Sequence, residues 1–211
     1  MNKKNQIKLT ISKSIETYFL NKEVKTTHPL DLIFPKERRI RSLIGGLETS
    51  LGTRVWEPLA KMFAKNNGFE VLNEKELNIA VPKIPEKVMH KLSDFENKKL
   101  NDPSLKHSDY RKEITAFIKE NNIQSTEKIK MPKGEGVDIW IRKGDEEFLI
   151  DIKTVQLNAG SGSKFNRNLL KWYTFRALDP KKGWTLNVCS HFRLILIKRI
   201  IGKKKAVKFL P

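Results

Sequence analysis

The chain has 211 residues, of which 38% are hydrophobic, so it can bury the core of one sizeable α/β domain. No window approaches the roughly 20 apolar residues that a membrane span needs, and the single cysteine excludes an internal disulfide. The formal net charge of +18 indicates a polyanionic partner, with nucleic acid favoured over an anionic membrane surface or a mere bias of composition.

The first third of the chain predicts an arm, a long helix and a strand. Residues 1–35 are polar and broken by prolines, so we expect an irregular N-terminal arm. From Arg38 to Asn66 apolar residues recur at spacings of three and four, which predicts an amphipathic helix that Pro58 should kink or divide. Asn67-Gly68 ends this helix, and GFEVL after it predicts a short strand.

Residues 73–130 are polar and rich in lysine, and they predict an insertion of two or three helices around Pro103. Two runs of β-branched and aromatic residues follow, at Val137–Arg142 and Glu147–Val155. Gly144-Asp145 between them suits a two-residue turn, so these runs predict a β-hairpin. A helix from about Phe165 to Leu178 and a last strand at HFRLILI complete the order.

The register of the hairpin follows from its turn. If Gly144 and Asp145 form the turn, Asp138 lies directly opposite Asp151. One face is then apolar and the other carries both acids, and a slip of one residue would move carboxylates into the apolar layer. The apolar face holds Val137, Ile139, Ile141, Phe148, Ile150 and Ile152, and the opposite face holds Asp138, Trp140, Arg142, Glu147, Leu149, Asp151 and Lys153.

This pairing predicts a metal site. Two carboxylates roughly 5 Å apart at their β-carbons repel each other unless a cation or proton intervenes. Hard cations such as Mg²⁺ are bound by carboxylate oxygens. Lys153 projects from the same face as the acids, where an ammonium can steer a water and stabilise charge on a phosphate, so the three residues fit phosphodiester hydrolysis. The alternative is an exposed salt-bridge ladder without catalysis.

Asp138 followed by Asp151-Ile152-Lys153, with a helix before and an αβ unit after, resembles the PD-(D/E)XK nuclease superfamily. The resemblance implies a restriction-endonuclease-like α/β fold, with an αβββαβ core and a mixed sheet flanked by helices, to which this chain adds its helical insertion. It also implies that the motif acids bind Mg²⁺ and that the lysine assists the water. Val137 departs from the pattern, because the superfamily has proline before its first acid.

Superfamily members commonly add an acid from the first helix, between a glycine and a hydrophobic run. Gly52 and Glu57, followed by PLAKMFAKNNGF, fit that pattern, so the role passes to Glu57 with Glu48 in reserve. These two positions are nine residues apart, about 900° of rotation, so an unbroken helix would point them to opposite sides. The metal ligands that the resemblance implies are Asp138, Asp151, Ile152 and Glu57.

The segment DIKTVQLNAGSGSKFNRNLLKWY is similar to type II restriction endonucleases of the TdeIII kind, because a glycine-containing loop and a basic helix follow the motif lysine. This likeness covers roughly residues 38–72 and 130–198, and it implies a homodimer that cuts a short palindrome. A solvated helix face is the alternative for the basic residues. The expected DNA contacts are Asn158, Lys164, Arg167 and Lys171, with Arg176 on the same helix.

We therefore predict a single nuclease domain over residues 1–211, which acts in the cytoplasm as a type II restriction endonuclease on double-stranded DNA. Two alternatives stay open. One is a repair or junction-resolving nuclease of the same fold, and cleavage of a plasmid into discrete fragments would separate it from a restriction enzyme. The other is a non-catalytic basic protein that binds nucleic acid, which magnesium-dependent cleavage by the pure protein would exclude.

Overall fold

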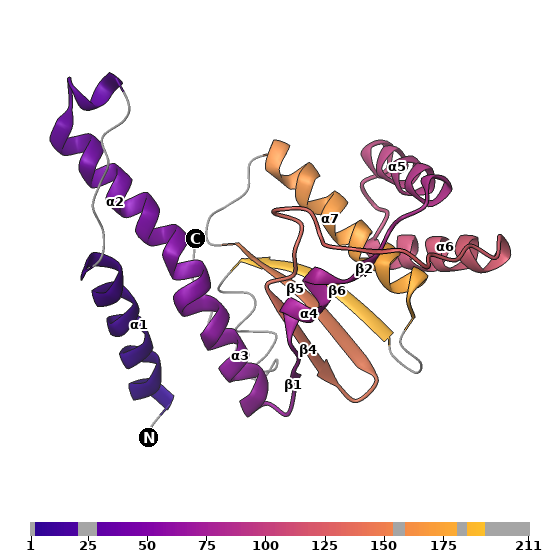
Figure 1. Ribbon diagram of the computed structural model, residues 1–211, viewed down its shortest axis with the longest axis horizontal. Coiled ribbons are helices and arrows are strands. Elements are labelled where there is room, and N and C mark those ends of the chain that lie inside the picture. Colours follow the sequence, from indigo (N-terminus) through magenta and orange to yellow (C-terminus); the bar gives the residue numbers. More distant parts are fainter. Residues whose placement is uncertain (1–2, 21–28, 154–158, 181–184, 193–211) are drawn as a thin grey trace. The chain divides into compact units, whose positions relative to one another are not determined.

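The computed structural model describes residues 3–20, 29–153, 159–180 and 185–192 (Figure 1). The chain divides into two compact units, each described by itself below. Of the described residues, the N-terminal unit holds 3–20, 29–67, 152–153 and 192, and the sheet unit holds 68–151, 159–180 and 185–191. The expectation of a single nuclease domain is not tested by this division and stays a prediction.

The described part of the N-terminal unit is largely helical. Its elements are α1 (Lys3–Leu20), η1 (Pro29–Asp31), α2 (Pro35–Leu51), η2 (Gly52–Trp56) and α3 (Glu57–Asn66). The irregular arm expected over residues 1–35 is therefore wrong where α1 forms. Tyr18 of α1 is buried, and its hydroxyl donates to the carbonyl oxygen of Leu43 in α2 (2.8 Å). Packing on α2 thus stabilises a helix that its own weak apolar pattern did not predict.

The long helix expected from Arg38 to Asn66 is divided ahead of Pro58. Across η2 it widens into a π-turn, in which the N–H of Glu57 donates to the carbonyl of Gly52, five residues back. Pro58 then falls in the first turn of α3 without an N–H to donate, and the carbonyl of Arg54, four residues back, accepts from the hydroxyl of Ser14 instead (3.1 Å). Gly68, with a φ of 77°, follows the end of α3 in the left-handed conformation that the sequence predicted.

The sheet unit contains a mixed four-stranded sheet in the order β1-β4-β5-β6 and a separate two-stranded ribbon of β2 and β3. The short strand expected at GFEVL is β1, and the helices expected between residues 73 and 130 are confirmed, whereas the ribbon was not expected. The bounds are β1 (Glu70–Val71), α4 (Glu74–Ile79), β2 (Val81–Pro82), α5 (Glu86–Asn101), α6 (His107–Glu120), β3 (Lys128–Ile129), β4 (Ile139–Lys143), β5 (Glu146–Lys153), α7 (Ala159–Leu178) and β6 (Thr185–Phe192).

The hairpin of β4 and β5 has the predicted register. The strands pair antiparallel from Ile139 opposite Ile150 to Lys143 opposite Glu146. Gly144 opens the turn with a φ of 57°, a conformation that glycine adopts without strain. The predicted α/β class and the mixed sheet flanked by helices are confirmed, and they are compatible with a restriction-endonuclease-like fold.

Two boundaries near the C-terminus differ from the prediction. α7 begins at Ala159 rather than near Phe165, so the expected glycine-containing loop at Gly160–Ser163 is helical instead. β6 begins already at Thr185, six residues before the expected strand HFRLILI, and its described part includes His191 and Phe192 of that strand. The rest of that expected strand, residues 193–197, lies outside the described residues.

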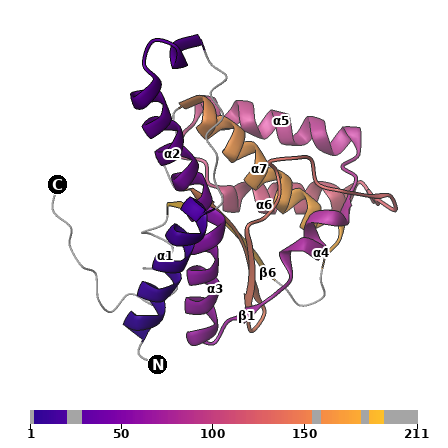
Figure 2. The ribbon, with the colours of Figure 1, turned by 60° about the vertical axis from the view of Figure 1, so that its left-hand side comes forward.

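The core of the sheet unit is built around α7. Trp172 and Leu170 of α7 are almost fully buried, and α5 and α6 both pack against this helix. The three helices gather in the same part of the unit in both views (Figures 1 and 2). The hydroxyls of Tyr110 in α6 and Thr174 in α7 lie 2.6 Å apart within this core. Among the described residues, no helix combines the length and apolar character that crossing a bilayer requires.

A buried ion pair joins α7 to the hairpin. Glu147 of β5 is fully buried, and Arg176 of α7 donates to both of its carboxylate oxygens, from Nε (2.8 Å) and from Nη2. The indole Nε1–H of Trp140 in β4 donates to the same carboxylate (2.6 Å). Because these donors satisfy both oxygens, the charge can be buried. Arg176, expected as a DNA contact, is therefore engaged inside the protein.

Replacing Arg176 by methionine should lower the free energy of unfolding by about 3–5 kcal/mol, because Glu147 would stay buried without its counter-charge. The matched control is Lys128→Met, which breaks an ion pair with Asp179 (3.0 Å) whose side chains are about half exposed. It should cost no more than about 1 kcal/mol. Urea unfolding measures both variants, and similar small losses in the two would contradict the structural importance of the buried pair.

Candidate active site

Asp138 and Asp151 lie together at the open end of the hairpin, each one residue beyond the last paired positions, Ile139 and Ile150. Asp151 belongs to β5 and is only 7% exposed, whereas Asp138 is half-buried at a bend just before β4. The backbone N–H of Asp138 donates to the carbonyl of Ile150 (3.1 Å). The backbone of the hairpin therefore brings the two acids to the same end of the sheet unit.

The alternation of side chains between the two faces of the sheet does not continue from β4 back to Val137, so the predicted face of Val137 is wrong. Val137 was expected on the apolar face with Ile139, but it belongs to the buried cluster that contains Trp140 and Leu149. The ladder pairs stop at Ile139, so the expected direct pairing of Asp138 with Asp151 is not among them. The position of Asp138 consequently depends on the chain that leads into it, residues 132–137, which we call the Glu135 loop.

Asn78, at the end of α4, holds the last residue of the Glu135 loop. Its Nδ2 donates to the carbonyl of Val137 (3.0 Å), and the N–H of Val137 donates to its Oδ1 (2.9 Å). The side-chain amide thus takes the place of a neighbouring strand. Gly136 makes room for it, because a β-carbon there would lie 3.2 Å from Nδ2, closer than nearly all such contacts.

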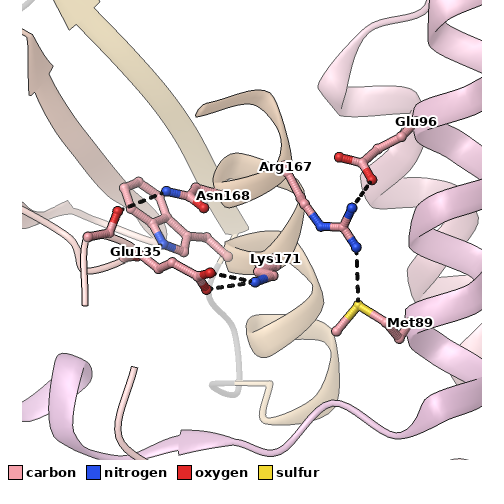
Figure 3. A network of polar contacts seen from close by, with 8 residues as sticks. Met89, Glu96, Glu135, Arg167, Asn168 and Lys171 are labelled. Atoms are coloured by element: carbon pink, nitrogen blue, oxygen red, sulfur yellow. Dashed lines mark hydrogen bonds and ion pairs between the residues drawn. The ribbon is translucent and has the colours of Figure 1, made fainter. Parts of the chain in front are cut away.

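Side chains of α7 hold the middle of the Glu135 loop (Figure 3). Lys171 donates to both carboxylate oxygens of Glu135, each at 2.7 Å. The indole Nε1–H of Trp172 donates to the carbonyl of Glu135 (2.8 Å), and Nδ2 of Asn168 donates to that of Gly134 (3.1 Å). Gly134 has a φ of 83°, which a residue with a β-carbon adopts only with strain. The loop before Asp138 is therefore fixed to α7 by three side chains.

Arg167 of α7 contacts the helical insertion. Its Nη1 lies 3.0 Å from a carboxylate oxygen of Glu96 in α5, and its Nη2 lies 4.0 Å from the sulfur of Met89 (Figure 3). Burial raises the pKa of Glu96, while the charges of Arg167 and Lys171 act in the opposite direction. Arg167 therefore compensates a partly buried acid and links α5 to α7.

The other predicted DNA contacts differ in their exposure and in their partners. Lys164 is exposed, and its ammonium lies 3.8 Å from where a β-carbon on Gly134 would be, so it sits beside the Glu135 loop. Lys171 is held by Glu135, with only 15% of its side chain exposed. Asn158 lies outside the described residues. Contact with DNA stays a prediction for all four residues.

The remaining predicted site residues lie at two places. Ile152 is buried, and it and Lys153 end β5 directly after Asp151. Glu57 is half-buried at the start of α3, whereas Glu48 is exposed on α2. Both glutamates belong to the N-terminal unit, and the approach of either to the acid pair stays a prediction.

The donor chemistry of the acid pair fits a magnesium ion. Magnesium prefers oxygen ligands and is usually held by one or two carboxylates while it keeps several waters. Asp138 and Asp151 supply two such carboxylates at one end of the hairpin. Within the described part of the chain no group of three or more His, Cys, Asp or Glu side chains is arranged to hold a metal, so the sheet unit offers the two acids without a third.

Sequence reasoning missed the residues that hold the Glu135 loop. Asn78 is 59 residues from Val137, and Glu135 is 36 residues from Lys171, so no local spacing connects them. The sequence of α7 held a partial indication, because four of its residues are spaced so that they share one face of a helix. Its members are Lys164, Asn168, Lys171 and Trp172.

Comparison with known proteins identifies a family. The model of the family described as "Type II restriction endonuclease, HinfI" matches residues 2–185, a span that includes both acids and all of α7. No curated protein and no solved structure matches the chain. The match bears out the expected restriction endonuclease, and it names HinfI where the sequence had been compared with the TdeIII kind. Enzymes of this family are nucleases that act on DNA.

Replacing Asn78 by alanine should destabilise the sheet unit by about 2 kcal/mol, because it leaves a buried N–H and a buried carbonyl of Val137 without partners. The control is Asn121→Ala, which removes an exposed hydrogen bond to Phe117 at the end of α6 (2.9 Å) and should cost less than about 1 kcal/mol. Urea unfolding compares the two variants. If Asn78→Ala proved no more costly than the control, Asn78 would not be holding Val137.

Proposed function

The chain belongs to the HinfI family of type II restriction endonucleases, and we propose that it cuts double-stranded DNA at a short specific sequence by magnesium-dependent hydrolysis of phosphodiester bonds. The observation that supports this proposal most is that Asp138 and Asp151 each lie one residue beyond the last paired positions at the open end of the hairpin. The net charge of +18 supports it, because a basic surface attracts the phosphates of DNA.

We propose further that the fold contains the αβββαβ core of PD-(D/E)XK nucleases. Its six elements would be α3, β1, β4, β5, α7 and β6, which follow one another along the chain in that order. The segment from α4 to β3 would then be an insertion between the first and second core strands. This assignment is supported by the sheet order, in which β1, β4, β5 and β6 are neighbours.

The proposed roles follow from the chemistry of the residues. Asp138, Asp151 and Ile152 hold the magnesium ion, and Glu57 is the further acid from the helix. When bound, magnesium neutralises charge on the phosphate and lowers the pKa of a water. Lys153 orients the attacking water and stabilises negative charge on the phosphate. The burial of Asp151 supports the assignment, because a carboxylate removed from water favours a neighbouring cation.

We propose Lys164 and Asn158 as the foremost contacts to the DNA backbone. Lys164 is supported by its exposure and by its place beside the Glu135 loop, which leads into Asp138. Arg167 and Lys171 were predicted as further contacts, but each is already paired with a glutamate, which makes both weaker candidates than Lys164. The proposed enzyme acts in the cytoplasm as a homodimer with one active site for each DNA strand.

The test is digestion of a plasmid of known sequence by the pure protein with magnesium. Discrete fragments with defined ends are expected, and Asp138→Asn and Asp151→Asn should each lower the cleavage rate at least about 10³-fold, because they remove ligands of the ion that stabilises the transition state. The control is Asp145→Asn, which changes an exposed acid at the turn of the same hairpin and should leave the rate within about twofold. Near-normal cleavage by either acid variant would refute the site.

A second experiment separates the two helix acids. Glu57→Ala should reduce cleavage steeply, by about 10²-fold or more, whereas Glu48→Ala should change it little, because Glu57 is half-buried and Glu48 is exposed. Rates measured at saturating magnesium, with far-ultraviolet circular dichroism to check the helices, make the comparison. The reverse order of effects would move the role of helix acid to Glu48.

A further inference from the structure

The first acid of the proposed site is not held by the strand ladder alone. Asp138 stands outside the paired residues of β4, and its backbone N–H donates to the carbonyl of Ile150 (3.1 Å). The chain before it, the Glu135 loop, contains two glycines, which add conformational freedom. Contacts that hold this loop therefore contribute to where Asp138 stands relative to Asp151.

Lys171 makes the one ionic contact to this loop among the described residues. Its ammonium lies 2.7 Å from each oxygen of Glu135, and the two side chains are only 15% and 19% exposed. An ion pair shielded from solvent in this way is screened less by salt than a surface pair. The neighbouring bonds from Asn168 and Trp172 reach backbone carbonyls of the same loop, so α7 holds it by one charged and two neutral contacts.

The same geometry argues against Lys171 as a contact to DNA. A cation already engaged by both oxygens of a carboxylate would have to give up that pairing to reach a phosphate. Lys164, seven residues earlier on α7, is exposed and lies beside Gly134, so the helix offers a separate residue for phosphate contact. The two lysines therefore differ in role although the sequence predicted the same role for both.

We propose that Lys171 is a positioning residue, which by pairing with Glu135 fixes the loop that carries Asp138 and so sets the two acids at the spacing that a divalent cation requires. The inference rests on the proposed function, because it assigns the acids to a metal site. Partners that orient metal ligands without touching the metal commonly change metal affinity when they are mutated.

The experiment compares Lys171→Met with Lys164→Met by three measurements on the full chain. Hydrogen exchange should be at least about tenfold faster in Lys171→Met at the amides of Val137 and Asp138, and unchanged at Lys143 near the turn. The affinity for calcium, measured by calorimetry, should fall about tenfold or more. The magnesium concentration for half-maximal cleavage should rise by a similar factor. Lys164→Met should leave the amide exchange and the calcium affinity unchanged, but it should weaken DNA binding and lower its dependence on salt.

A second pair of variants keeps the inference testable if Lys171→Met folds poorly. Lys171→Arg preserves the charge and should retain most of the calcium affinity, while Glu135→Gln keeps the size of the side chain but removes the ion pair and should behave like Lys171→Met. Normal amide exchange at Val137 and Asp138 in Lys171→Met or Glu135→Gln would overturn the inference. So would a Lys171→Met protein that loses DNA affinity while its calcium affinity stays normal.

The failure of the inference and that of the proposed function have different signatures. If the unmodified protein neither binds calcium at Asp138 and Asp151 nor cleaves DNA with magnesium, the proposed function fails, whatever the exchange measurements give. If the unmodified protein cleaves and binds calcium, but the Lys171 and Glu135 variants do so equally well, the positioning role alone fails.

Discussion

The buried ion pair between Glu147 and Arg176 is the interaction on which the rest of the sheet unit depends. It connects the second strand of the hairpin to α7, and Trp140 of the first strand donates to the same carboxylate. A charge placed in this interior is tolerated only with good geometry, so it specifies how α7 lies against the hairpin. The face of α7 that holds the Glu135 loop is thereby set in place, and with it the approach of the chain to Asp138.

The hairpin was the part of the fold most open to prediction, and the physical reason is that its information is local. Gly144 closes a two-residue turn, and alternation of apolar and polar residues allows one register only. Prediction failed where structure depends on distant partners. The helix of α1 depends on packing through Tyr18, and the departure of Val137 from alternation depends on Asn78, which lies 59 residues away.

In the candidate site, too, the residues defined by local spacing were predictable and those defined by distant contacts were not. The two acids were predicted from spacing within one hairpin, whereas the residues that hold the loop before Asp138 come from α4 and α7 and carry no common motif. The basic residues of α7 show the same limit. Sequence treated Lys164, Lys171 and Arg176 as one group, but the fold exposes the first, pairs the second with a loop and buries the third against Glu147. Charge alone therefore does not reveal which cations are available to a partner.

The π-turn between α2 and α3 has a consequence for helical phase. A turn closed five residues back contains one residue more than an α-helical turn, so α3 is rotated about 100° relative to an uninterrupted continuation of α2. The side of the helix from which Glu57 projects is thus set by η2 and no longer by the count of residues from Glu48. Loss of a single residue from Gly52–Trp56 would let this turn close as an α-helical turn and keep Glu57 on the same side, whereas the same loss within α2 would turn Glu57 by about 100° relative to the residues before the deletion.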